Sequence, residues 1–138
     1  MAQDQPLRGF VVLVVEDETD TLSSLARLIR DAFGCRVLSA TSSDEALRII
    51  DSGLHVDFVL TDVVMPKKDG LTLARQVRRR LPSLPVVLAT GRPDVVDSVT
   101  ERGGIALLKP YTIERLEAVF SEHLRVERLG SKPHQLAS

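Results

Sequence analysis

Four short apolar runs, each followed by polar residues, restrict the folds open to this chain. The runs at residues 10–15, 58–61, 85–89 and 105–108 are rich in valine and leucine and do not alternate with polar residues. Strands of a parallel sheet that helices cover on both faces have this pattern. Such sheets bind ligands beyond the carboxyl ends of their strands. The residues that follow the runs are therefore predicted to converge on one edge of a sheet. They are Glu16 and Asp17, Asp62, Thr90 and Lys109.

Segments with helical periodicity lie between the runs. Residues 19–33 carry apolar side chains at steps of three and four, and Gly34 supplies a C-terminal stop. A strand is expected at residues 35–40, before a helix whose start has the spacing of a capping box, Ser42 with Glu45.

Three further helices are expected in the second half of the chain. One follows the turn-rich residues 65–70 and is closed by Pro82. Another has Pro93 in its first turn, and the last has Thr112 as its N-cap. Five strands thus alternate with five helices, which indicates an α/β domain with parallel strands and right-handed crossovers.

The chain is expected to be one domain. Its 138 residues are enough to bury a full core. The domain is predicted over residues 7–128. Residues 129–138 carry no apolar pattern and are predicted to form a flexible tail.

Composition excludes several classes of protein. The net charge of −1 gives no overall field that favours nucleic acid or an anionic membrane. The apolar runs are far shorter than the roughly 20 residues that span a bilayer, and no secretory signal opens the chain. The single cysteine, Cys35, suits a reducing cytosol and is interpreted as a buried structural thiol. A cytoplasmic protein is therefore expected.

The residues at the strand ends suit phosphate chemistry. Glu16, Asp17 and Asp62 provide carboxylates with no histidine or cysteine beside them, a hard oxygen site that favours Mg²⁺ over zinc. Crowded carboxylates need a neutralising cation. That cation would hold a phosphoryl group against a carboxylate nucleophile. Lys109 and the Thr90 hydroxyl would then contact the phosphoryl oxygens.

In this order, these residues resemble the receiver domain of two-component response regulators. The similarity extends from about residue 10 to residue 124. It rests on Glu16-Asp17, Asp62, Met65-Pro66, Asp69-Gly70, Thr90-Gly91 and Lys109-Pro110. It implies a flavodoxin-like (βα)5 fold, a doubly wound five-stranded parallel sheet with strand order 2-1-3-4-5.

The resemblance also implies roles at the acidic end of the site. Asp62 would accept a phosphoryl group from a histidine kinase or phosphotransfer protein. Asp17 and Asp62 would bind Mg²⁺ together with the backbone carbonyl of Val64, and Glu16 would act mostly through water. The protein would catalyse only its own phosphorylation and dephosphorylation, and would otherwise be a signalling protein and not an enzyme.

The remaining site residues would contact the phosphoryl group and respond to it. Lys109 would pair with it, and the bond from Lys109 to Pro110 would be cis. Thr90 would move toward a phosphoryl oxygen and report phosphorylation to the fourth helix, as a shift between two conformers.

Ala106 departs from the receiver pattern. Many receivers have Tyr or Phe three positions before the lysine, and that ring swings inward as the threonine moves. A receiver subgroup lacks the aromatic residue, and the sequence resembles it. The signal is predicted to pass through a hinge at residues 91–93 instead. Val64 and Arg92 occupy positions that influence phosphoryl lifetime, and the apolar Val64 predicts a long-lived phosphoryl form.

Two other functions remain open at this stage. A Mg²⁺-dependent aspartyl phosphatase of the haloacid-dehalogenase type also uses a carboxylate nucleophile, but it has Asp-x-Asp after the first strand, where this chain has Glu16-Asp17-Glu18. A cap domain is absent too. A pseudo-receiver would keep the fold as an interaction module without phosphorylation, and the complete set of site residues argues against it. The chain is also either a single-domain protein, the simpler interpretation, or a piece of a hybrid kinase.

Surface charges predict little about partners. The basic cluster on the third helix has no interleaved aromatic residue, so it is interpreted as a solvated face and no direct DNA binding is expected. It comprises Arg75, Arg78, Arg79 and Arg80. Lys67 and Lys68 are candidates for steering an anionic partner. A downstream protein target is expected, and a homodimer through the fourth and fifth helices is left open.

Overall fold

A computed structural model describes residue 5 and residues 7–123 as a parallel sheet with helices on both faces. The strands are β1 (Val11–Val15), β2 (Arg36–Ala40), β3 (Phe58–Asp62), β4 (Val86–Thr90) and β5 (Ile105–Leu108). The helices are α1 (Thr19–Phe33), α2 (Ser43–Asp51), α3 (Gly70–Arg80), α4 (Pro93–Glu101) and a fifth helix described over residues 113–123. All neighbouring strands pair in parallel, in the order β2-β1-β3-β4-β5. The predicted fold class and strand order are therefore confirmed.

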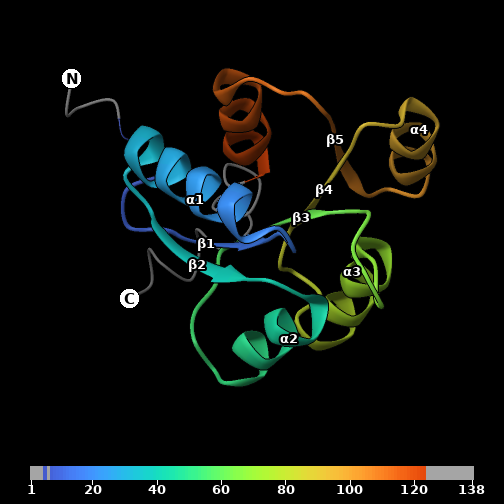
Figure 1. The fold of residues 1–138 in the computed structure, drawn as a ribbon, viewed down its shortest axis with the longest axis horizontal. Coiled ribbons are helices and arrows are strands. Elements are labelled where there is room, and N and C mark those ends of the chain that lie inside the picture. The colour runs from blue at the N-terminus through green and yellow to red at the C-terminus, as the bar shows by residue number, and fades with distance from the viewer. Residues whose placement is uncertain (1–4, 6, 124–138) are drawn as a thin grey trace, which may run out of the picture.

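Two apolar layers enclose the sheet. On one face α1 and the 113–123 helix pack against alternate residues of the central strands, and the stacked rings of Phe58 and Phe120 lie 4.7 Å apart at this layer's centre. On the other face α2 and α3 cover the alternate set, including Leu13 and Val59. Figure 1 shows α1 and α2 on opposite sides of the sheet. Burial of β1 and β3 on both faces explains why their sequences do not alternate.

Helix α4 is held less firmly than its neighbours. Of its nine residues, Val99 alone is buried. Val99 joins a small apolar cluster with Val63 and Leu88, against which Ala106 also packs. In Figure 1, α4 stands at the β5 end of the sheet, apart from α2 and α3. Helix α4 buries fewer residues than α1, α2 or α3, which lowers the cost of displacing it.

The helix starts agree with the sequence in most places. Pro93 occupies the first turn of α4, and the Thr112 hydroxyl accepts a hydrogen bond from the Arg115 amide at 3.0 Å. The Ser42 hydroxyl accepts from the Glu45 amide at 3.1 Å, but the Glu45 carboxylate accepts from the amide and hydroxyl of Thr41 and not from the Ser42 amide. The predicted capping box is thus only half formed.

Element boundaries differ slightly from those predicted. Strand β1 begins at Val11 and β2 at Arg36, one residue later than expected in each case, and α3 ends at Arg80. Cys35, just before β2, is buried as predicted, and burial raises the pKa of its thiol to about 11. Leu124, the end of the domain at residue 128 and the tail at 129–138 lie outside the described residues. None of the described helices is long and apolar enough to cross a bilayer.

Candidate functional site

Three strands deliver acidic and hydroxyl side chains to one edge of the sheet. Glu16 and Asp17 follow β1, Asp62 is the last residue of β3, and Thr90 is the last residue of β4. The register places Asp62 beside Ala89 of β4. The predicted convergence at the carboxyl ends of the strands is therefore present in the fold.

The three carboxylates form one cluster. Glu16, Asp17 and Asp62 each offer a carboxylate oxygen, and these oxygens all lie within 4.8 Å of one another. Glu16 is buried, Asp62 is partly buried and Asp17 is exposed. Burial, a side-chain hydrogen bond with Asp62 and the nearby negative charges raise the pKa of Glu16 to about 7. Without a cation, the cluster therefore holds a proton near neutral pH.

This donor set fits Mg²⁺. Mg²⁺ prefers carboxylate, carbonyl and water oxygens, and the cluster supplies only oxygen donors. Burial first, and then the neighbouring carboxylates, raise the pKa of Glu16, so a cation at this site would favour its charged form. Within the described residues, no other group of three metal-ligating side chains comes this close together.

Lys109, directly after β5, contacts the cluster. Its ammonium donates a hydrogen bond to the Asp62 carboxylate at 2.8 Å, and its backbone amide donates to the Thr90 carbonyl at 2.7 Å. The Lys109 to Pro110 peptide bond is cis, as the resemblance implied. The lysine therefore already contacts the carboxylate on which phosphate chemistry was predicted.

Thr90 is buried at the end of β4. Its hydroxyl accepts a hydrogen bond from the Arg92 amide at 3.2 Å, which ties it to the residue before α4. The Arg92 guanidinium forms a 2.8 Å ion pair with Asp94, and both side chains are largely exposed. Arg92 thus pairs with the first turn of α4 and not with the acidic cluster.

The loop after β3 is fixed against the backbone of Asp62. Gly70 sits so close to the Asp62 carbonyl that an added Cβ would overlap it, and the Gly70 amide donates to the Val63 carbonyl at 2.8 Å. The Asp69 carboxylate caps α3 through the Thr72 amide at 2.9 Å. The Val64 side chain points outward and is 76% exposed.

The structure shows local roles that the sequence did not reveal. Glu18 is the N-cap of α1, and its hydrogen bonds with Thr21 lower its pKa. Lys68, considered as a steering charge, forms a 2.8 Å ion pair with Asp44. Arg80, from the basic cluster, pairs with Asp51 at 2.7 Å. The position of a carboxylate directly before the helix that begins at Thr19 was the sequence signal that could have identified Glu18 as an N-cap.

Tyr111 belongs to the surroundings of the site. It packs against the core layer to which α1 contributes and, with Lys109 and Pro110, lines a hollow of about 520 Å³ that also includes Glu16 and Asp62. Burial, followed by the charges of Asp62 and Glu16, raises the pKa of its phenol to about 12. Tyr111 is therefore a packing residue whose phenol also borders the acidic site.

Comparisons with known proteins agree with this geometry. The response regulator receiver domain model matches residues 12–121. The chain is 27% identical to the probable C4-dicarboxylate response regulator DctR of Halalkalibacterium halodurans, over 99% of this chain and 60% of that protein. It is 35% identical to the positive alginate biosynthesis regulatory protein of Pseudomonas aeruginosa, over 86% of this chain and 48% of that protein.

A solved structure has the same architecture. A response regulator receiver domain protein from Clostridium thermocellum superposes with a TM-score of 0.79 at 30% identity, covering 87% of this chain and 98% of that one. The chain spans 60% and 48% of the two curated relatives named above, so it matches a part of each. Family model, fold and strand-end residues together place this chain in the receiver domain family of two-component response regulators.

Proposed function

We propose that this receiver accepts a phosphoryl group on Asp62. The observation that carries the proposal is the contact between Asp62 and Lys109, 2.8 Å apart at the edge of a three-carboxylate cluster. An oxygen nucleophile, a metal-ligating set and an ammonium are the groups that phosphoryl transfer requires. A pseudo-receiver would have no need to keep them together, and a haloacid-dehalogenase phosphatase would place its nucleophile after β1.

Glu16, Asp17, Asp62 and the Val64 carbonyl would hold Mg²⁺. The ion would supply charge neutralisation for the carboxylates and for the incoming phosphoryl oxygens. Glu16 carries a proton near neutral pH in the metal-free site, so it would release that proton when the ion binds. The buried position of Glu16 suits a role through water, while the more accessible Asp17 suits direct contact.

In the transfer step, an Asp62 carboxylate oxygen forms a bond to phosphorus as the bond from phosphorus to the phosphohistidine nitrogen breaks. The products are an aspartyl phosphate on this chain and a free histidine on the donor. Lys109 exchanges its contact with the carboxylate for one with a phosphoryl oxygen, where it neutralises charge. Dephosphorylation follows when water attacks phosphorus and the bond to the Asp62 oxygen breaks.

The signal would leave through Thr90 and α4. Movement of the Thr90 hydroxyl toward a phosphoryl oxygen would release its hydrogen bond from the Arg92 amide, the residue directly before α4. Because α4 buries only Val99, a small change at its N-terminus suffices to shift it. The donor would be a histidine kinase or phosphotransfer protein in the cytoplasm, and the output a contact with another protein and not with DNA. A homodimer through α4 and the 113–123 helix remains a candidate form of that output.

Incubation with acetyl phosphate tests the acceptor. Intact-mass measurement should show one added phosphoryl group with Mg²⁺ and none with EDTA. Asp62→Asn should abolish the added mass, and Lys109→Gln should slow its appearance by at least about tenfold, since one electrostatic contact to a transferring group contributes about 1.4 kcal/mol or more to the barrier.

Asp57→Asn is the matched control. Asp57 also lies beside the sheet, but it accepts hydrogen bonds from the Val11 amide and His55, away from the cluster. It should be labelled like the unmodified chain. A folded wild type that stays unlabelled with Mg²⁺ would instead support the pseudo-receiver.

A further inference from the structure

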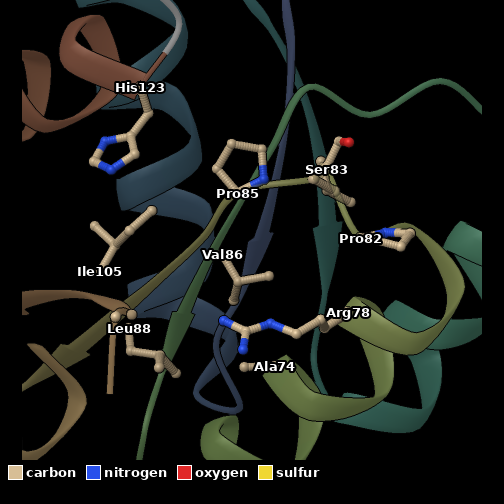
Figure 2. Close-up of a pocket in the computed structure, with 12 residues that line it drawn as sticks. Ala74, Arg78, Pro82, Ser83, Pro85, Val86, Leu88, Ile105 and His123 are labelled. Atoms are coloured by element: carbon tan, nitrogen blue, oxygen red, sulfur yellow. The ribbon is translucent and has the colours of Figure 1, made fainter. Parts of the chain in front are cut away.

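A second hollow lies at the opposite end of the strands from the acidic site. It measures about 250 Å³ and is formed by α3, the first residues of β4 and β5, and the 113–123 helix (Figure 2). Apolar side chains make most of its wall. They include Ala74, Pro85, Val86, Leu88 and Ile105.

Basic groups occupy the wall of this groove. Figure 2 shows the Arg78 side chain extending from α3 toward Val86 and Leu88 of β4. Arg78 is exposed and forms no ion pair within the described residues, whereas its neighbour Arg80 is paired with Asp51. None of the described residues that line the groove is acidic.

His123 adds a polar atom on the opposite side. Its Nδ1 donates a hydrogen bond to the Val119 carbonyl at 2.9 Å, so this nitrogen carries the proton and Nε2 is left for another partner. The groove therefore combines an apolar floor with an unpaired guanidinium and a free imidazole nitrogen.

We propose that this groove binds a short segment of a partner protein in which a bulky apolar side chain stands next to an acidic one. The volume accommodates one or two buried side chains, the usual anchors of a protein interface, and is smaller than the 300 Å³ or more typical of pockets for free small molecules. The unpaired Arg78 guanidinium selects a carboxylate, preferably through two parallel hydrogen bonds.

Charge directs such a segment to this groove and away from the phosphoacceptor. The hollow around the phosphoacceptor is lined by Glu16, Asp20 and Asp62, with Lys109 as its cation. An acidic segment is repelled there and attracted to Arg78 at the other end of the sheet. Kinase docking and output binding would therefore take place on separate ends of the molecule.

The groove is also connected to α4. Gly103 and Gly104, which join α4 to β5, line it. An added Cβ at Gly104 would lie 2.8 Å from the Val99 side chain, so the buried anchor of α4 rests on the groove wall. A shift of α4 would change the shape of the groove. A role of the groove in passing on the phosphorylation signal rests on the proposed function, but the groove's ability to bind a peptide segment does not.

A designed peptide tests the site. The probe is the acetylated and amidated sequence Ser-Gly-Asp-Leu-Phe-Glu-Gly-Ser, titrated into the full chain labelled with ¹⁵N, with amide shifts as the readout. The expected shifts centre on Ala74, Arg78, Gly103, Gly104 and Ile105. A peptide with Asn and Gln in place of the acids should bind about threefold more weakly, and one with two alanines in place of Leu-Phe at least about tenfold more weakly.

Arg78→Gln should weaken the parent peptide about threefold and remove the preference for acids. Arg75→Gln is the matched control, because Arg75 lies on the same helix and contacts Thr72, outside the groove. This variant should keep both the affinity for the parent peptide and the preference for acids. Absence of peptide binding, equal binding of the neutral peptide, or shifts confined to α1 would overturn the proposal. Phenylacetate binding as tightly as the peptide would also overturn it, in favour of a small-anion site.

Asp62→Asn separates this proposal from the proposed function. The variant lacks the proposed acceptor and keeps the groove, so it should bind the peptide as the wild type does. Loss of labelling in Asp62→Asn with retained peptide binding supports both proposals, while a wild type that is labelled but binds no peptide keeps the acceptor and removes the groove.

Discussion

Gly70 fits beneath the backbone of the proposed acceptor because it has no side chain. An added Cβ would overlap the Asp62 carbonyl, and backbone atoms cannot move aside as the end of a flexible side chain can. Gly70→Ala is expected to lower the free energy of unfolding by about 1–3 kcal/mol, the usual cost of overpacking, and to slow acetyl phosphate labelling by displacing Asp62. Urea unfolding and intact-mass time courses measure the two effects.

Gly91→Ala is the control for this substitution. Gly91 has no atom within 4 Å of an added Cβ, so the change should leave stability unchanged or slightly raise it by restricting the unfolded chain. Equal losses of stability in both variants would show that the Gly70 contact is not specific.

The exposed Val64 side chain predicts a slow loss of the phosphoryl group. Val64 is 76% exposed and has no polar atom with which to orient an attacking water. Val64→Asn is expected to shorten the phosphoryl lifetime, and a tenfold change would correspond to about 1.4 kcal/mol in the barrier. Decay of the phosphoryl mass after removal of acetyl phosphate measures it, with Val64→Thr as a polar control of shorter reach. Identical lifetimes would show that the side chain at position 64 does not limit hydrolysis of the phosphoryl group.

The positions of the candidate site residues were predictable where the strands fix them. Asp62, Thr90 and Lys109 could be placed because each follows a recognisable apolar run, and parallel strands end at one edge. Two local contacts could not be predicted from the sequence, because both depend on how separate segments meet. They are the half-formed capping box at Glu45 and the pairing of Lys68 with Asp44. Those local choices involve differences of a kilocalorie or less, too small for a sequence pattern to rank.

At the scale of elements, α4 is the part of the fold suited to carry the switch without an aromatic residue. Ala106 leaves a small side chain beside Leu88 and Val99, and Val99 is the single buried residue of α4. Amide hydrogen exchange in residues 91–104 is therefore expected to be faster than in α1 and to change on adding beryllium fluoride with Mg²⁺. Unchanged exchange there, with the mimic bound, would exclude the hinge at residues 91–93.

Asp62→Asn supplies the control for that measurement. It removes the oxygen on which the mimic forms, so exchange in α4 should no longer respond, while α1 and β1 should exchange as in the wild type. A response that persisted in Asp62→Asn would show that the added salts act on α4 directly.

The helices differed in how clearly their sequences predicted them. Helix α1 has a full apolar stripe that ends at Phe33 and a glycine in the left-handed region, Gly34 at φ 72°, so both of its boundaries were predicted. Helix α4 has a weaker stripe, and its first-turn proline was the more informative signal. How loosely α4 attaches could not be predicted, because it depends on which of its residues meets Val63 and Leu88 in the folded chain, and Val99 alone is buried.

At the scale of the whole molecule, the acidic site opposes folding unless a proton or a cation neutralises it. The pKa of Glu16 is raised from 4.5 to about 7, so the folded state keeps a proton that the unfolded state releases. Between these values the unfolded chain binds fewer protons, and the free energy of unfolding therefore falls as pH rises. The lowered pKa values of Glu18, Asp44, Glu45 and Asp94 act in the opposite direction, but below about pH 4.5.

Thermal unfolding across pH 5 to 8 tests this linkage. In EDTA the melting temperature is expected to fall as pH rises, and Glu16→Gln should flatten the curve over that interval because it removes the titrating group. Mg²⁺ should raise the melting temperature more at pH 8 than at pH 5, since at pH 5 it competes with the Glu16 proton. Glu114→Gln, an exposed carboxylate outside the cluster, should keep the slope of the wild type. If the melting temperature of Glu16→Gln depends on pH as that of the wild type does, Glu16 is not the group that causes the pH dependence. Groups other than Glu16 must then neutralise the cluster.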